Sequence, residues 1–158
     1  MKNINMNNEN YLDVYTFVGH MRDLAFECLK IKTNVPFTIG LDMEKGLYGS
    51  TIAAEDTKDK MNVRYVEINI DQRMDDMINT IFHETRHIYQ YQTYKRYMLL
   101  RHRRTIRRTK PRTFMQYWIQ PIEICARLYA RYAMKKYKRQ IDNIVQQYKD
   151  KTLEMKLY

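Results

Sequence analysis

The chain has 158 residues, of which 44% are hydrophobic, and its formal net charge is +10. The apolar share excludes a disordered composition, and the length suits one domain with a core of its own. Two cysteines, Cys28 and Cys125, are too few for a disulfide framework and favour free thiols. The sequence shows no signal peptide and no apolar run of membrane-spanning length, so we expect a soluble cytoplasmic protein.

The first half of the chain predicts one helix followed by three strands. Residues 1–9 are polar and rich in asparagine, and we expect them to be disordered. Apolar residues then recur at helical spacing over 11–31, with Asn10 as the expected N-cap. Three short segments rich in β-branched and aromatic residues follow at 36–42, 46–55 and 62–71. Turn-forming residues separate these segments, which predicts a three-stranded antiparallel meander.

The second half predicts two long helices joined by a basic connection. The first runs from about Gln72 to about Arg104, with Asp71 as its N-cap. The last runs from Ile122 to about Tyr148, with Pro121 in its first turn. The sequence has no internal repeat and no compositional boundary. It therefore predicts a single α+β domain over residues 1–158.

The helix that begins near residue 72 contains the sequence His83-Glu84-Thr85-Arg86-His87, which has the pattern His-Glu-x-x-His. Histidines four residues apart lie on one face of a helix, and together they can bind one Zn²⁺. Glu84 lies about 100° around the helix from His83 and can reach a water on that metal without binding the metal itself. Zinc lowers the pKa of such a water, and the glutamate accepts its proton. The alternative is a surface helix whose two histidines align by chance.

A zinc site needs a third protein ligand, for which Glu123 is the best candidate. It is the only acid in residues 85–141, and its neighbours are apolar or basic. A buried carboxylate in such surroundings needs a partner, which is either a metal or Arg127 one helical turn on. Of the other histidines, His20 suits a packing or surface role, and His102 lies among cations that disfavour a metal.

The motifs HETRHIYQ and PIEICARLYA resemble those of the gluzincins, zinc metallopeptidases with two histidines on one helix and a glutamate on a later one. The short chain and the order of its elements are similar to minigluzincins, to ImmA/IrrE-like peptidases and to small phage- and plasmid-encoded zincin-like proteins. The resemblance implies a zincin-like fold in which His83, His87 and Glu123 bind Zn²⁺. It also implies that Glu84 is the general base and that a metal-activated water attacks a peptide bond of a protein substrate. The basic connection departs from the family pattern.

A hydrolase of this type also needs a group that stabilises the oxyanion of its tetrahedral intermediate. Tyrosine and arginine are suitable residue types, and several lie close to the two motifs. The candidates for the oxyanion or for substrate contact are Tyr91, Arg127, Tyr129 and Tyr132, with Gln90 beside Tyr91. The sequence does not choose among them.

The basic segment, residues 95–112, contains nine lysines or arginines and no acid. This pattern favours contact with nucleic acid or with an acidic protein. The candidate contacts are Arg101, Arg103, Arg104, Arg107, Arg108, Lys110 and Arg112. The alternative is a solvated surface that only maintains solubility. The second functional hypothesis is therefore a regulatory protein of zincin fold that binds nucleic acid, or inhibits a partner, without catalysis.

Overall fold

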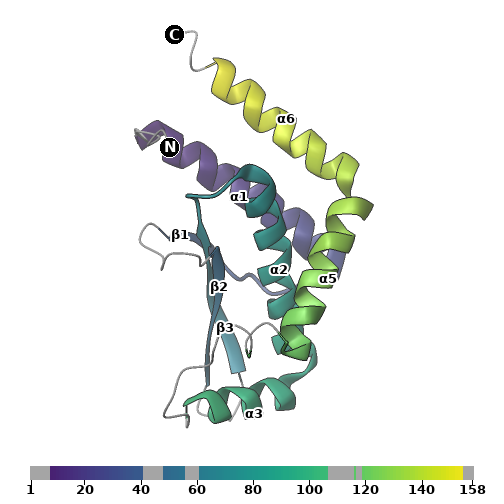
Figure 1. Cartoon of the computed structure of the whole chain (residues 1–158). Helices are drawn as coiled ribbons and strands as arrows, with labels where there is room; N and C mark the ends of the chain where they lie inside the picture. The colour runs from purple at the N-terminus through teal and green to yellow at the C-terminus, as the bar shows by residue number, and fades with distance from the viewer. Residues whose placement is uncertain (1–7, 41–47, 56–60, 107–115, 117–118, 155–158) are drawn as a thin grey trace.

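The computed structural model describes residues 8–40, 48–55, 61–106, 116 and 119–154. The described residues form an α+β domain of five helices and one three-stranded sheet (Figure 1). Their order is α1 (Asn8–Leu29), β1 (Phe37–Gly40), β2 (Gly49–Glu55), β3 (Met61–Asn69), α2 (Met74–Thr93), α3 (Lys95–Ile106), α5 (Pro121–Lys136) and α6 (Lys138–Glu154).

The sheet is mixed, and the predicted antiparallel meander is wrong. β3 is the central strand, with β1 parallel to it on one side and β2 antiparallel to it on the other. In a meander the second strand would lie in the centre. Here the third strand takes that place; it is the longest of the three, and it buries Val66 and Ile68 completely. The predicted turn over 42–46 and most of the one predicted over 56–62 lie outside the described residues, but Met61 and Asn62 belong to β3 instead.

A register shift between β2 and β3 lets the whole of β3 present apolar side chains to the helices. The shift falls between Ile52 and Ala53 of β2 and leaves Arg64 of β3 opposite no residue. Such a bulge reverses the alternation of the strand, so that odd-numbered residues point to one face of the sheet before it and even-numbered residues point to that face after it. Met61 before it and Val66 after it are consequently both buried.

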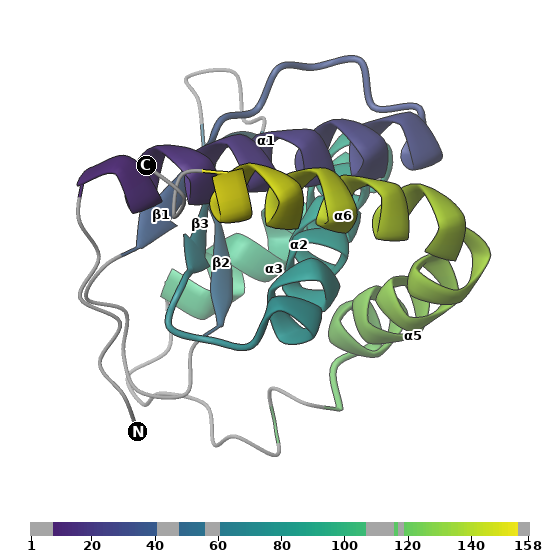
Figure 2. The same cartoon turned by 90° about the horizontal axis from the view of Figure 1, so that it is seen from above.

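α2 lies between the sheet and α5 (Figure 1). Its apolar residues recur at helical spacing, and Met77, Ile78, Ile81, Phe82 and Ile88 are all buried in the core. α1 and α6 lie side by side and close the same core from above (Figure 2). A single core thus joins the sheet to α1, α2, α5 and α6.

α5 approaches α2 through a strip of alanines. Ala126, Ala130 and Ala133 are fully buried and face the core. Small side chains at this spacing let two helix backbones come close together. The strip begins one turn after Glu123 and therefore fixes the position of that residue relative to α2.

Both predicted long helices are divided by a short break. The helix expected over 72–104 is interrupted at Tyr94, where the backbone leaves helical geometry at φ −107° and ψ 44°. The helix expected over 122–148 begins at Pro121 as predicted, but it is interrupted at Tyr137 with φ −103° and ψ 19°. Neither break occurs at a glycine or proline, so hydrophobic periodicity alone could not locate them.

The first residues of two helices also differ from the prediction. α1 begins at Asn8, two residues before the expected N-cap Asn10, and the rest of the stretch expected to be disordered lies outside the described residues. The N-cap of α2 is Arg73 and not Asp71. The helix starts later because the Asn69 side chain accepts a hydrogen bond from the Asp71 backbone N–H at 2.8 Å, which holds these residues in a turn. None of the helices in the described part of the chain has the length and apolar character needed to cross a membrane.

Candidate metal centre

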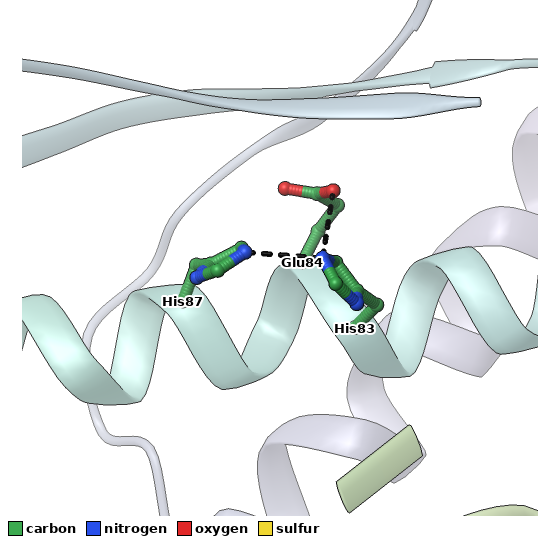
Figure 3. A group of neighbouring side chains, drawn as sticks. All are labelled: His83, Glu84 and His87. Carbon is green, nitrogen blue, oxygen red and sulfur yellow. Dashed lines mark hydrogen bonds and ion pairs between the residues drawn. The ribbon is translucent and has the colours of Figure 1, made fainter. Parts of the chain in front are cut away.

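Three polar side chains project from the middle of α2 into the space below the sheet. His83 and His87 lie one turn apart with their rings at 81° to each other, and their Nε2 atoms are 3.1 Å apart. Figure 3 shows Glu84 turned from the helix toward the strands, beside both rings. Its Oε1 lies 4.0 Å from His83 Nε2. The three residues form a group whose ligand atoms could hold a metal ion.

Glu123 reaches the same point from the first turn of α5. Its Oε2 lies 3.4 Å from His83 Nε2 and 3.3 Å from His87 Nε2. The residue is only 2% exposed, so its carboxylate is withdrawn from water and directed at the two imidazoles. The close packing of α5 on α2 thus brings together the three residues that the sequence suggested as metal ligands.

The spacing of these three donor atoms is close to that of the ligands around a tetrahedral metal ion. The distances between His83 Nε2, His87 Nε2 and Glu123 Oε2 are 3.1, 3.3 and 3.4 Å. Zinc bonds of about 2.0–2.2 Å in tetrahedral geometry place neighbouring ligand atoms about 3.3–3.6 Å apart. Two imidazoles and one carboxylate also form a donor set that zinc accepts in catalytic sites, where the fourth position is left for water or substrate.

Glu84 is held beside this triangle by β2. The Thr51 hydroxyl donates a hydrogen bond to Glu84 Oε2 at 2.7 Å, which leaves Oε1 on the side of the histidines. Gly49 makes this contact feasible, because a Cβ there would lie 2.5 Å from Thr80 Cγ2 and 3.1 Å from Glu84 Cγ. The absence of a side chain lets β2 approach α2 closely enough for Thr51 to reach the carboxylate. Neither Gly49 nor Thr51 was expected from the sequence to serve the site.

Gln90 orients His87. Its Oε1 lies 2.8 Å from His87 Nδ1, and its Nε2 donates to the Ile122 carbonyl oxygen at 3.1 Å. An amide oxygen can only accept, so we infer that Nδ1 carries the imidazole hydrogen and that the Nε2 lone pair faces the cluster. Gln90 is 1% exposed and ties the first turn of α5 to α2. The sequence placed it near the oxyanion, whereas the structure gives it a positioning role.

We expect Gln90→Leu to weaken zinc binding by about 10–100-fold, the usual effect of removing a group that orients a ligand histidine. Chelator-competition titration of the purified protein measures the change. Gln92→Leu is the matched control, because Gln92 lies on the same helix and bonds to Thr33 at the surface instead. Equal zinc affinity of Gln90→Leu and Gln92→Leu would show that Gln90 does not position His87.

Arg101 of α3 contacts the other oxygen of Glu123. Its Nη2 lies 3.4 Å from Glu123 Oε1 and donates to Gln120 Oε1 at 2.8 Å. The sequence assigned Arg101 to a polyanion-binding surface and considered Arg127 as an ion-pair partner for Glu123. The break at Tyr94 instead turns α3 so that Arg101 points at the carboxylate. Glu123 thereby has one oxygen beside a cation and the other beside the two histidines.

The remaining candidates of the basic segment are only partly described. Arg103 forms an ion pair with Glu55 at the end of β2. The side chains of five other candidates lie outside the described residues: Arg104, Arg107, Arg108, Lys110 and Arg112. Contact with nucleic acid or an acidic protein through residues 95–112 therefore stays a prediction.

Tyr91 lies within electrostatic reach of the cluster. Burial raises the pKa of its hydroxyl, nearby Arg101 opposes the rise, and the carboxylates of Glu123 and Glu84 add to it. The phenol consequently keeps its proton and remains a hydrogen-bond donor.

The other candidates occupy different surroundings. Tyr129 packs against the core with its ring 5.3 Å from the Arg86 guanidinium. Tyr132 is exposed on the outer face of α5, and Arg127 is partly buried one turn after Glu123. His20 is exposed on α1. Tyr91 is therefore the candidate for oxyanion stabilisation that the structure associates most directly with the cluster.

Comparison with known proteins adds no relative. No family model matches the sequence, and no curated protein or solved structure matches the chain. The interpretation of the cluster therefore depends on its own side chains and their geometry.

Proposed function

We propose that this chain is a zinc-dependent metallopeptidase of the gluzincin type, with a zincin-like fold, that hydrolyses a peptide bond of a protein substrate with a metal-activated water. The observation that carries the proposal is the convergence of His83 Nε2, His87 Nε2 and Glu123 Oε2 within 3.4 Å of one another, with Glu84 beside them. Zinc held there would lower the pKa of a water to about 7 and polarise the substrate carbonyl.

The residues around the cluster have separate roles in this proposal. Glu84 Oε1 accepts the proton of the attacking water and later donates it to the departing amine, while Thr51 holds Oε2. Gln90 keeps the His87 lone pair directed at the metal. Tyr91 donates a hydrogen bond to the oxyanion, a role that its electrostatic contact with Glu123 and Glu84 supports.

β2 offers a way to bind an extended peptide beside the site. Within the described part of the chain it pairs only with β3, so its outer edge has unpaired backbone groups. An extended segment can add to such an edge through main-chain hydrogen bonds. Because Thr51 of β2 contacts Glu84 directly, a peptide on this edge would lie close to the general base.

The test is zinc content together with hydrolysis by the full chain. We expect one zinc per chain by elemental analysis after gel filtration, and cleavage of members of a quenched fluorescent peptide library. A chelator should abolish the cleavage, and zinc but not magnesium should restore it, because magnesium prefers oxygen ligands. Protein without stoichiometric zinc, or cleavage that a chelator leaves unchanged, would contradict the proposal.

The alternative, a regulatory protein that binds nucleic acid without catalysis, draws less support from the described side chains. Two of its candidate cations, Arg101 and Arg103, contact acidic groups of the protein itself. The metallopeptidase is therefore the function that the site supports best.

A further inference from the structure

An apolar groove of about 590 Å³ runs along the outer face of α5, away from α2. Its lining residues are Pro121, Ile124, Cys125, Leu128, Tyr129 and Tyr132. Ile124, Leu128 and Tyr132 are large side chains with 42%, 60% and 53% of their surface exposed. Large apolar side chains that gather on a surface mark an interaction site more often than scattered ones do.

The surroundings of the groove are positively charged. Residues 124–137 contain no acid and four cations, Arg127, Arg131, Lys135 and Lys136, whereas Lys138 at the start of α6 pairs with Asp142. Arg131, Lys135 and Lys136 are exposed on α5 itself. A partner that buries its apolar side chains in the groove would therefore meet lysine and arginine at the rim.

A further cation lies beneath the floor of the groove. The Arg86 guanidinium is 5.3 Å from the ring of Tyr129, and its Nη2 lies 3.5 Å from Cys125 Sγ. The guanidinium also lies 4.6 Å from the ring of Tyr89. In the part of the chain that the structure describes, no carboxylate pairs with Arg86, and its buried Nε lacks a hydrogen-bond partner. The positive charge under Cys125 and Tyr129 is thus not neutralised by the surrounding described side chains.

We propose that the groove is a docking site for an acidic amphipathic helix of a partner protein. Ile124, Leu128 and Tyr132 are spaced four residues apart along α5, and the groove from Pro121 to Tyr132 extends about 16 Å, or three helical turns. A helix with apolar residues at i, i+3 or i+4, i+7 and i+11 spans that length. Carboxylates on its flanks complement the cations of α5.

The same charges argue against other occupants. A second copy of this chain would bring two positive faces together, which costs Coulomb energy. Nucleic acid would satisfy the cations but would leave the apolar centre without a matching surface. The site lies on the opposite face of α5 from Glu123, so the proposal does not depend on zinc binding or on hydrolysis.

The test uses two labelled 16-residue helical peptides with the same leucine pattern, one with glutamates at the remaining positions and one with lysines. We expect the full chain to bind the acidic peptide in fluorescence anisotropy, more weakly as salt rises, and not to bind the basic peptide. Leu128→Glu should weaken binding at least about tenfold, because it places a carboxylate in the centre of the groove. Gln147→Glu, which adds the same charge at an exposed position of α6, should bind like the wild type.

Several results would overturn the proposal. Equal binding of the two peptides, or of the wild type and Leu128→Glu, would show that the groove does not select an acidic helix. Self-association in sedimentation that Leu128→Glu abolishes would assign the groove to a second copy. Binding to anionic lipid vesicles without binding to the acidic peptide would assign it to a membrane surface. Circular dichroism verifies that each variant is folded.

Discussion

Replacing His83 with alanine is expected to remove stoichiometric zinc from the purified protein. The change leaves two protein ligands where a zinc site needs at least three, so the loss of affinity should exceed the roughly 100-fold effect of losing a group behind a ligand. Glu123→Ala should have the same result, because its Oε2 is the third corner of the triangle formed with His83 and His87. Elemental analysis after gel filtration and chelator competition both measure the change.

His20→Ala is the matched control, since it removes an exposed histidine of α1 that has no place in the proposed site. Zinc should raise the melting temperature of the wild type and of His20→Ala, but not that of His83→Ala, because only a ligand that binds the native state stabilises it. If His83→Ala retained zinc with wild-type affinity, the metal would lie elsewhere and the proposed site would be wrong.

The pH dependence gives a second measure of the same site. Burial lowers the pKa of His87, but the carboxylates of Glu123 and Glu84, with the Gln90 contact, outweigh it and raise that pKa above its ordinary value. In metal-free protein the protonated imidazole therefore stabilises the fold fully below the unfolded-state pKa of about 6.5, and this contribution is lost as pH rises through the folded-state pKa. Zinc binds only the neutral imidazole. The stabilisation of the fold by zinc should therefore grow as pH rises through the folded-state pKa of His87. As pH rises through the folded-state pKa of His87, the melting temperature with chelator should lose the contribution of the protonated imidazole. The increase in melting temperature caused by zinc should become larger over the same pH range.

The parts of the site that could be predicted are those that local sequence determines. The separation of His83 and His87 by four residues places them on one helix face wherever the helix lies, and the apolar stripe of α2 marked that helix. Glu123 stood out because it is the only acid in residues 85–141. These features need only a helical period and the cost of burying a charge.

The parts that could not be predicted depend on contacts between distant segments. Thr51 meets Glu84 across 33 positions, and only because Gly49 lets β2 approach α2. Arg101 reaches Glu123 because the helix breaks at Tyr94, where the sequence has no glycine or proline. The strand order failed for a related reason, since three short strands can pair in several ways and only packing against α2 selects one.

Replacing Glu84 with glutamine is expected to separate metal binding from catalysis. Glutamine has nearly the same shape and can still accept the hydrogen bond of Thr51, but it cannot accept a proton from the attacking water. Loss of a general base commonly lowers kcat by about 10²–10⁴-fold. Zinc affinity should change little, because Glu84 Oε1 lies 4.0 Å from His83 Nε2 and outside the triangle of ligand atoms. Steady-state cleavage of the fluorescent peptides and chelator competition provide the two measurements.

The two measurements together also distinguish the roles of the two glutamates. The group on α2 that could hold a metal includes Glu84, whereas the shorter carboxylate distances to both histidines belong to Glu123. If Glu84→Gln lost its zinc while Glu123→Gln kept it, Glu84 would be the third ligand and the proposed assignment would be reversed. Glu27→Gln, which removes an exposed carboxylate of α1, should leave both zinc affinity and cleavage unchanged. Unchanged cleavage in Glu84→Gln with zinc still bound would rule out Glu84 as the general base, because glutamine cannot accept the proton of the attacking water.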